Sequence, residues 1–277
     1  MRLIADSGAT KADWVGISSS EARFSWHTGG LSPAHMTRED IVRVLREELM
    51  PHTAEAVDSI FFYGAGCTPG LSPVVERALA EAFPQAAVRV ESDLVGAARA
   101  LCGEERGIAC ILGTGSASCE YDGIGIVKQV PSLGYVLGDE GSGAVLGRML
   151  VADFLKGRLP QEASEAFAAA HGITVADAVE YVYRRPLPAR YLASFVPFMH
   201  EHRHAEGIRG IIATAFDAFF ERNISAYDTR SLSVNFVGSV AYFFEEELRE
   251  AAARAECRVV RIVRRPIEAL AEYHKGR

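Results

Sequence analysis

Short apolar runs alternate with helical patterns along the whole chain. Runs of strand length, bounded by turn residues, cover 2–5, 12–17, 59–63, 87–91, 108–112, 117–121, 232–237 and 258–263. Helical patterns cover 37–49, 73–82, a segment opening at 92, 142–156, 161–170, 208–227 and 239–255. Pro266 suits the first turn of a last helix. This alternation predicts an α/β fold with mixed sheets.

The two halves of the chain open with the same arrangement, which is a strand, a polar turn and a returning strand. The first example spans residues 2–17 and the second spans 108–121. The change of half falls in the polar, loop-like segment 103–107. We therefore expect one domain at 1–105 and a second at 106–265. The terminal segment 266–277 could join the first domain, and the sequence leaves this open.

Composition and charge narrow the class of protein. The 277 residues are 49% hydrophobic and 23% charged, as in soluble two-domain proteins. The formal charge of −7 gives no general attraction to nucleic acid or to anionic membranes. No apolar run approaches the roughly 20 residues of a membrane helix, and the first residues show no signal-peptide pattern. We expect a cytoplasmic protein without nucleic-acid or membrane partners.

The first polar turn combines a carboxylate, small residues, a hydroxyl and an ammonium group. Its residues are Asp6, Ser7, Gly8, Ala9, Thr10 and Lys11. Backbone N–H groups, the Thr10 hydroxyl and the Lys11 ammonium can approach phosphate oxygens, and Asp6 can hold a hydrated Mg²⁺ through water. An ordinary hairpin could use the same residues, so this segment alone leaves both interpretations open.

The second polar turn is rich in glycine and hydroxyl groups. It reads Gly113, Thr114, Gly115 and Ser116 and again joins two strands. Glycine lets a ligand approach the backbone closely, and the hydroxyls add hydrogen-bond donors. Two such turns about 105 residues apart, one opening each half, indicate a pair of phosphate-binding loops.

Acidic residues follow two further elements. Ser92 or Asp93 could cap a helix, and Asp93 could also act as the base that accepts a proton from an attacking hydroxyl. These two roles are compatible. Asp139 and Glu140 stand among glycines from Gly134 to Gly143, just before a helix. Asp139 could bind sugar hydroxyls, whereas a helix N-terminus also favours acidic residues.

A final loop, Gly238 and Ser239, follows an apolar strand and precedes a helix. A flat ring such as adenine could lie against this backbone, although a plain strand-to-helix turn has the same sequence. The chain contains no G-x-x-x-x-G-K-[ST] motif, which excludes a P-loop enzyme.

Taken in order, these segments resemble the N-acetylglucosamine kinase and BadF/BadG/BcrA/BcrD-type ATPase family of the sugar kinase, Hsp70 and actin superfamily. The string from Gly138 to Ser142 is the most diagnostic part. The resemblance implies two actin-like, ribonuclease H-like domains that close over ATP, Mg²⁺ and a sugar. It also implies cytoplasmic carbohydrate metabolism, and homodimers are common in the family.

The resemblance also implies roles for particular residues. The nucleotide-binding set would be Asp6, Ser7, Gly8, Thr10, Lys11, Gly113, Thr114, Gly115, Gly238 and Ser239. The sugar-binding set would be His35, Asp93, Ser116, Ala117, Gly134 and Asp139. Asp93 would be the catalytic base, and Asp6 would hold Mg²⁺ through water. The expected activity is transfer of the ATP γ-phosphoryl group to an amino sugar, with N-acetylglucosamine first and muramic acid or glucosamine as further candidates.

Some positions depart from the family pattern. Ser7 and Ala9 replace glycines of the first motif, and Ala34 and Ala117 stand where members acting on N-acetylglucosamine tend to have asparagine. The lost amide groups leave the sugar's identity open. Two other functions remain as alternatives: a non-catalytic ATP and sugar sensor, and an ATPase that activates a partner enzyme. The second type uses paired cysteines for an iron–sulfur cluster, and the sequence suggests no suitable cysteine in a glycine-rich loop.

Overall fold

The computed structural model describes residues 1–8, 10–53 and 55–275, and the chain divides into two compact units. Unit 1 draws on residues 1–105, 123–126 and 265–277, and unit 2 draws on 106–122 and 127–264. Ala9 of the first predicted motif lies outside the described residues, as do the last two residues of the predicted terminal segment.

Unit 1 is built on a five-stranded mixed sheet with the order β3-β2-β1-β4-β5. The strands are β1 (Arg2–Ser7), β2 (Lys11–Ile17), β3 (Arg23–Gly29), β4 (Ser59–Gly64) and β5 (Ala87–Ser92). β2 is antiparallel to β1 and β3, whereas β1, β4 and β5 run parallel. The register pairs Ser7 with Gly64 and Gly64 with Ser92, so the carboxyl ends of the parallel strands meet at one edge.

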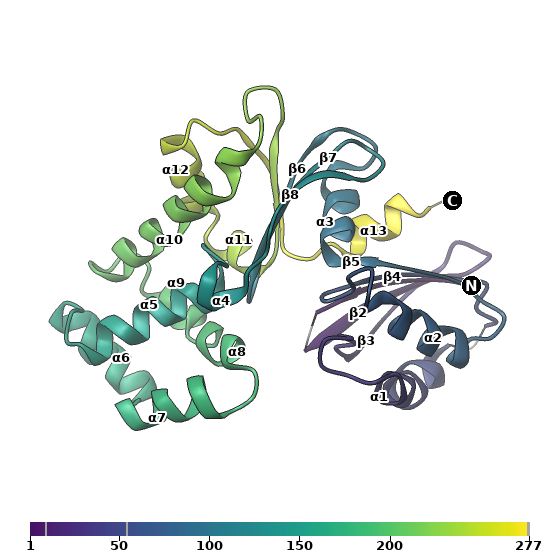
Figure 1. Cartoon of the computed structure of the whole chain (residues 1–277), viewed down its shortest axis with the longest axis horizontal. Coiled ribbons are helices and arrows are strands. Elements are labelled where there is room, and N and C mark those ends of the chain that lie inside the picture. Colours follow the sequence, from purple (N-terminus) through teal and green to yellow (C-terminus); the bar gives the residue numbers. More distant parts are fainter. Residues whose placement is uncertain (9, 54, 276–277) are drawn as a thin grey trace. The chain divides into compact units, whose positions relative to one another are not determined.

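Helices cover both faces of this sheet (Figure 1). One face carries α1 (Arg38–Val44), with its continuation through single turns at Leu45–Leu49 and Met50–His52, and α2 (Ser72–Ala82). The other face carries α3 (Asp93–Cys102) and α13 (Ile267–Tyr273). Successive residues of β1 point to opposite faces, so Leu3 packs in the core with Leu79 whereas Ile4 packs with Leu270.

Unit 2 contains a second five-stranded sheet with the order β10-β9-β6-β7-β8. Its strands are β6 (Gly107–Leu112), β7 (Ser116–Tyr121), β8 (Ile126–Val130), β9 (Val234–Val237) and β10 (Val259–Val263). β6, β9 and β10 run parallel, and β7 is antiparallel to β6. Ile111 pairs with Val237, which pairs with Val263, so the loops that follow these three strands leave the same edge.

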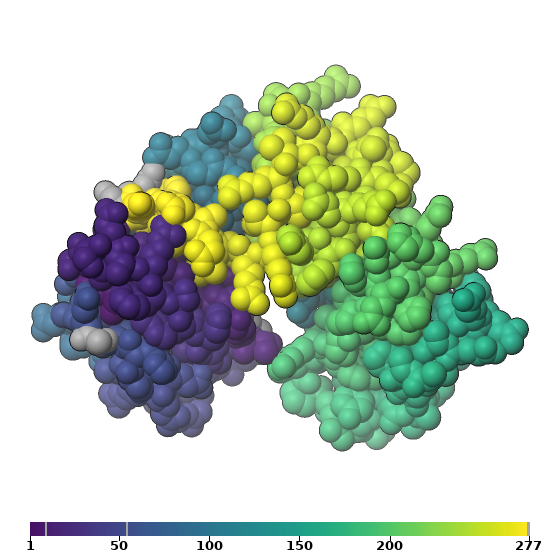
Figure 2. Space-filling model, turned by 180° about the vertical axis from the view of Figure 1, so that it is seen from behind, coloured from purple at the N-terminus to yellow at the C-terminus, as the bar shows by residue number. Residues whose placement is uncertain are grey.

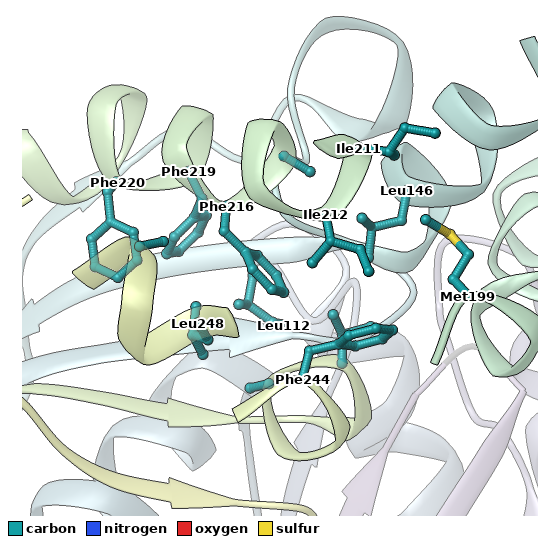
Figure 3. Packing of buried hydrophobic residues seen from close by; sticks show 14 of the residues in the cluster. Leu112, Leu146, Met199, Ile211, Ile212, Phe216, Phe219, Phe220, Phe244 and Leu248 are labelled. Atoms are coloured by element: carbon teal, nitrogen blue, oxygen red, sulfur yellow. The ribbon is translucent and has the colours of Figure 1, made fainter. Parts of the chain in front are cut away.

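The rest of unit 2 is mainly helical. The helices are α4 (Gly134–Leu137), α5 (Gly143–Leu155), α6 (Gln161–His171), α7 (Val175–Val179), α8 (Pro188–Ala193), α9 (Val196–Glu201), α10 (Ile208–Arg222), α11 (Ser239–Phe243) and α12 (Glu245–Arg254), with single turns at Glu180–Arg184 and Ile224–Ala226. One apolar core joins helices and sheet (Figure 3). In it, Phe216 and Phe219 from α10 pack with Leu112 at the end of β6 and with Phe244. This packing supports the loop that begins at Gly113.

The structure confirms the predicted alternation of elements and corrects it in places. β3 carries mainly exposed or half-buried side chains, so it lacks the apolar run used to predict strands. The single helix expected over 239–255 is divided at Phe244, whose fully buried side chain lies in the unit 2 core. Within the described residues, none of the helices has the length and apolar character needed to cross a membrane.

Candidate functional site

Three carboxylates gather at the strand-end edge of unit 1. Asp6 lies near the end of β1 and pairs directly across the hairpin with Asp13 of β2. Asp93 begins α3 immediately after β5. Burial, followed by the negative charges of Asp93 and Asp13, raises the pKa of Asp6 to about 7. The sheet register therefore brings together two carboxylates that are 87 residues apart in sequence (93 minus 6).

Asp93 is held at the first turn of α3. Ser92 is the N-cap, because its hydroxyl accepts a hydrogen bond from the Val95 N–H at 3.3 Å. Oδ1 of Asp93 accepts from the Leu94 N–H at 2.9 Å. Burial raises the pKa of Asp93, and the backbone hydrogen bond from Leu94 opposes this rise. Since Ser92 performs the capping, the Asp93 carboxylate retains acceptor capacity for a substrate proton.

The three carboxylates differ in whether a basic side chain lies beside them. Asp13 lies 2.6 Å from Lys11 Nζ and 2.7 Å from His27 Nδ1. Across residues 1–8, 10–53 and 55–275, no basic side chain forms an ion pair with Asp6 or Asp93. A partly buried carboxylate pair with a raised pKa and no protein cation matches a site that receives a proton or a cation from its ligand.

The first predicted phosphate turn is a tight connection between β1 and β2. Gly8 N–H donates to the Lys11 carbonyl at 2.9 Å. The Ser7 side chain is buried, and its hydroxyl accepts from Leu31 N–H at 2.9 Å. This hydroxyl therefore fixes the loop after β3. Thr10 is exposed and free to meet a ligand, whereas the Lys11 ammonium is engaged with Asp13.

Two more loops of unit 1 lie near this edge. Gly64 ends β4, and a Cβ built there would lie 2.8 Å from Cys67 Sγ. Gly66 has φ +81°, and a Cβ there would lie 3.1 Å from the Ser32 hydroxyl oxygen. This turn therefore packs closely against the loop that carries Ser32 and His35. The His35 side chain is exposed, and the backbone N–H of His35 donates to the Ser32 carbonyl at 3.1 Å. His35 is thus placed on the loop beside the end of β4, on a different loop from Asp93.

Cys67 is a buried cysteine beside a glycine-containing turn. It directly follows residues 64–66. Its side chain is buried, and burial together with the charge of Asp93 raises the pKa of the thiol to about 12. A thiol that resists ionisation is a poor ligand for an iron–sulfur cluster, which requires thiolate.

The second predicted phosphate turn is fastened to the start of α5. Gly143 N–H donates to the Gly113 carbonyl at 2.8 Å, and Ala144 N–H donates to the Thr114 carbonyl at 3.0 Å. These donors belong to the first turn of α5, where N–H groups have no partner within the helix. The Thr114 side chain is exposed. The loop is therefore fixed through its carbonyl groups and leaves the Thr114 hydroxyl available.

Asp139 lies directly against this turn. Its Oδ1 accepts from Ser116 N–H at 3.3 Å, and a Cβ at Gly115 would lie 3.1 Å from its Oδ2. Burial raises the pKa of Asp139, the hydrogen bond from Ser116 lowers it, and the nearby Glu140 charge raises it. Asp139 has φ +57°, an uncommon conformation for a residue other than glycine and one that is often found at functional sites.

The loop around Asp139 is held from both sides. Glu140 accepts from the Asn223 side-chain amide at 3.3 Å, which ties the loop to the end of α10. Gly134 begins α4, and its carbonyl accepts from Gly138 N–H at 2.8 Å. Gly134, Ser116 and Asp139 therefore belong to one connected region of unit 2. Ala117, also predicted to bind sugar, follows Ser116 on β7.

The predicted adenosine loop contacts the second predicted phosphate turn. Gly238 has φ +127°, and a Cβ at this position would lie 2.1 Å from the carbonyl oxygen of Leu112. Gly238 N–H donates to the Val263 carbonyl at 3.0 Å. Only glycine fits here, so the chain brings Gly238 and Ser239 against the residue that precedes Gly113. Two predicted nucleotide segments separated by more than 120 residues are thus neighbours within unit 2.

Sequence reasoning did not single out several groups that build the site. Asp13 was missed, although the tight turn fixes its position opposite Asp6 and could have revealed it. The roles of Gly143 and Ala144 as donors to the second polar turn were also missed, because they depend on how α5 meets β6. Such long-range backbone contacts leave no local signal in the sequence.

Solved structures of similar proteins identify the fold. One, a candidate N-acetylglucosamine kinase from Chromobacterium violaceum, is 18% identical, and the match covers 98% of each chain with a TM-score of 0.75. A ROK family glucokinase from Streptomyces griseus, solved with glucose and AMPPNP, is 14% identical, with 100% and 99% covered and a TM-score of 0.61. The fold, with its two five-stranded mixed sheets, is thus the actin-like ATPase and sugar kinase fold.

A third solved structure establishes the family. It is a candidate N-acetylglucosamine kinase from Porphyromonas gingivalis that is 42% identical, covers 99% of this chain and 98% of its own, and has a TM-score of 0.95. This chain belongs to the N-acetylglucosamine kinase and BadF/BadG/BcrA/BcrD-type ATPase family. No family sequence model matches the chain, and neither does any curated protein sequence.

Proposed function

We propose that this protein is a kinase that transfers the γ-phosphoryl group of ATP to a hydroxyl of a small amino sugar. N-acetylglucosamine is the first candidate, followed by glucosamine and muramic acid. The 42% identical relative from Porphyromonas gingivalis, itself a candidate N-acetylglucosamine kinase, supports this substrate class. The glucokinase that shares the fold was solved with a sugar and an ATP analogue, which supports the reaction type.

The observation that carries the proposal is the state of Asp93. Its carboxylate is half-buried at the carboxyl end of a parallel strand, has a raised pKa and forms no ion pair within the described residues. A carboxylate in this state is suited to accept a proton. In the reaction the γ-phosphorus–oxygen bond of ATP breaks and a new bond forms to the sugar oxygen. The hydroxyl proton passes to Asp93, and ADP leaves.

Residues in each unit supply the proposed nucleotide contacts. In unit 1, Thr10 and the backbone around Gly8 would donate to phosphate oxygens. In unit 2, Thr114 and the backbone of Gly113 and Gly115 would do the same, and Gly238 and Ser239 would lie against adenine. The exposed side chains of Thr10 and Thr114 support these roles. Lys11 would have to leave Asp13 to reach a phosphate, since the two lie 2.6 Å apart.

Proposed sugar contacts involve the second acidic loop. Asp139 would accept hydrogen bonds from sugar hydroxyls, with Ser116, Ala117 and Gly134 beside it in unit 2. Within unit 1, His35 is the residue proposed to contact sugar. The hydrogen bond from Ser116 N–H to Asp139 supports this role, because it orients the carboxylate while leaving other lone pairs available. Alanine at positions 34 and 117 would shape a less polar pocket than asparagine would.

The residues present also fit a hydrated Mg²⁺ ion at Asp6. No group of three or more potential ligands forms a complete metal cage among the residues that the structure describes. Mg²⁺ bound with ATP usually takes only one or two carboxylates and fills its other positions with water and phosphate. The unpaired charge of Asp6 suits that role. When bound, the ion would neutralise charge on the transferred phosphoryl group. Cytoplasmic location and homodimer formation stay predictions.

The test is ADP release with Mg²⁺ and ATP against a panel of sugars. The panel contains N-acetylglucosamine, glucosamine, muramic acid, glucose and N-acetylmannosamine, with a reaction lacking sugar as the baseline. The proposal expects ADP release that depends on one amino sugar and exceeds the baseline at least tenfold. ATP binding without stimulation by any sugar would contradict the kinase and favour the sensor or the partner-activating ATPase.

A further inference from the structure

The C-terminal end of the chain packs beside the helix that carries Asp93. α13 contacts α3, β1 and β2 within unit 1. In the space-filling view, the yellow C-terminal residues lie against the purple N-terminal ones (Figure 2). His274 directly follows α13, is 3% exposed and stacks on the Phe61 ring with 3.9 Å between ring centroids. A polar ring buried this deeply requires polar partners.

Those partners form a chain of hydrogen bonds that reaches α3. His274 Nε2 lies 2.7 Å from the Tyr63 hydroxyl oxygen. Arg99, on α3, donates to the same oxygen at 2.8 Å and to Glu91 Oε1 at 3.2 Å. The Arg99 guanidinium also lies 5.6 Å from the centre of the Tyr63 ring. We call Glu91, Arg99, Tyr63 and His274 the anchoring network.

The direction of the hydrogen bond between Arg99 and Tyr63 is fixed by the chemistry of the guanidinium group. Arg99 can only donate, so the Tyr63 oxygen accepts from it. Burial raises the pKa of Tyr63, although the Arg99 charge opposes this rise, so the hydroxyl keeps its hydrogen at neutral pH. The hydrogen bond between this hydroxyl and His274 Nε2 runs in the direction that the tautomer of the imidazole sets.

The anchoring network lies next to the turn between β5 and α3 that carries Asp93. Glu91 lies on β5 two residues before Asp93, and Tyr63 immediately precedes Gly64, which pairs with Ser92. α3 packs closely against β4, since a Cβ at Gly96 would lie 2.9 Å from the Tyr63 side chain. Arg99 therefore joins the body of α3 to both strands that end beside its first residue. Any rotation of α3 about its axis would break these bonds and move the Asp93 carboxylate.

We infer that Tyr63, Arg99 and His274 are positioning residues that hold the Asp93 carboxylate in its reactive orientation, and that the C-terminal segment is thereby required for catalysis. This inference rests on the proposed role of Asp93 as the base. Reaction rates depend steeply on such placement, and a displacement near 1 Å can cost on the order of a hundredfold. None of the three residues is expected to touch ATP or sugar, so their loss acts on kcat.

The experiment uses the full chain and the sugar found in the panel. Tyr63→Phe keeps the ring and removes the shared hydroxyl. We expect kcat to fall roughly ten- to a hundredfold while KM for ATP and for sugar stays within about twofold. His274→Ala should give a similar loss. His274→Gln should recover most of it, since its side-chain amide can form a hydrogen bond with the Tyr63 hydroxyl either as donor or as acceptor.

Arg23→Ala is the matched control. Arg23 lies on β3 and forms an ion pair with Glu272 of α13, so its loss loosens the same helix without touching the anchoring network. This variant should keep the wild-type kcat. Thermal unfolding of each variant, and kcat expressed per ATP-binding site, separate lost activity from lost folded protein.

Two outcomes would overturn the inference. Unchanged kcat per ATP-binding site in Tyr63→Phe and His274→Ala would reduce the network to a stabilising role. Equal losses in the two His274 variants and in Arg23→Ala would show that α13 acts only through general packing. Asp93→Asn distinguishes this failure from that of the proposed function. If Asp93→Asn keeps full activity, the base assignment is wrong, whereas a large loss there with unchanged Tyr63→Phe activity rejects the positioning role alone.

Discussion

The strand-end edge of unit 1 and the strand-end loops of unit 2 have opposite chemistry on similar sheets. In unit 1, Asp6 and Asp93 have raised pKa values and no cationic partners within the described residues. In unit 2, the loops at Gly113 and Gly238 present backbone and small side chains, and Asp139 is the main charge. Both regions lie where parallel strands end, the common place for ligand sites in α/β sheets.

Under the proposed function, the two regions would bind groups of opposite charge. Carboxylates suit a metal ion and a proton, which are positive. Glycine-rich backbone suits phosphate and an aromatic base, because N–H groups and small residues allow close approach. A chain with net charge −7 could bind ATP only if such local groups offset the general repulsion. Variants that exchange or remove these properties should therefore affect the two regions differently.

The largest effect is expected at Asp93. Asp93→Asn removes the proton acceptor but keeps the size of the side chain. We expect kcat to fall by about 10² or more, while the ATP dissociation constant stays within about twofold. Asp217→Asn is a matched control, because it removes an equal charge from an exposed ion pair with Arg254. Normal sugar phosphorylation by Asp93→Asn would remove this residue from the mechanism.

A substitution that strains the backbone should disrupt the glycine-containing loops of unit 2. Gly238→Ala places a Cβ 2.1 Å from the Leu112 carbonyl and strains a φ of +127°. We expect a loss of about 2–4 kcal/mol in the free energy of unfolding and weakened ATP binding. The matched control is Gly210→Ala in α10, where a Cβ meets open space and should stabilise the helix slightly. Urea unfolding measures the stability of the two variants, and calorimetric titration measures their ATP binding. Equal stability of the two variants would refute this role of Gly238.

Removing the threonine hydroxyls should have a moderate effect on binding alone. Thr10→Ala and Thr114→Ala each remove an exposed hydroxyl that has no structural role in the described contacts. Each should weaken ATP binding about tenfold, the value of one hydrogen bond to a charged group, without changing thermal stability. Calorimetric titration with ATP tests this. Normal ATP affinity in both variants would contradict the assignment of the two turns as phosphate loops.

The smallest effect concerns Asp6 and pH. The folded state raises the pKa of Asp6 from 3.8 to about 7, so this group favours folding at low pH and loses that contribution as pH rises from about 4 to about 7. Asp6→Asn should therefore raise the melting temperature of the ligand-free protein by a few degrees at pH 8 and by less at pH 5. Asp217→Asn controls for net charge. An equal shift at both pH values would contradict a raised pKa at Asp6.

Local patterns allowed much of the fold to be predicted. Apolar runs such as 108–112 became buried strands, and the Thr37 capping pattern began α1 with Thr37 and Asp40 forming a capping box. β3 escaped prediction because its position at the sheet edge leaves most of its side chains exposed or half-buried. The break at Phe244 depends on burial in the unit 2 core, which the helical periodicity of 239–255 does not reveal.

The candidate site was predictable where a segment carries its own chemistry. Asp93, Asp139 and the two polar turns stand out by residue type and spacing. The features of the site that could not be predicted are contacts between segments that are distant in the sequence. The approach of Gly238 to Leu112 and the hydrogen bond between Tyr63 and His274 join residues more than 120 positions apart. Only the folded sheet and its helices create them, so no local pattern could have indicated either.

The most direct test of the central claim is to identify the products formed from ATP. The protein is incubated with Mg²⁺, ATP and the most active sugar, and mass spectrometry with phosphate analysis quantifies ADP, sugar phosphate and inorganic phosphate. Our account predicts sugar phosphate and ADP in equal amounts for the wild type and for Asp217→Asn, and about a hundredfold less of both products in the same time for Asp93→Asn. ADP accompanied by inorganic phosphate, without any sugar phosphate, would contradict it.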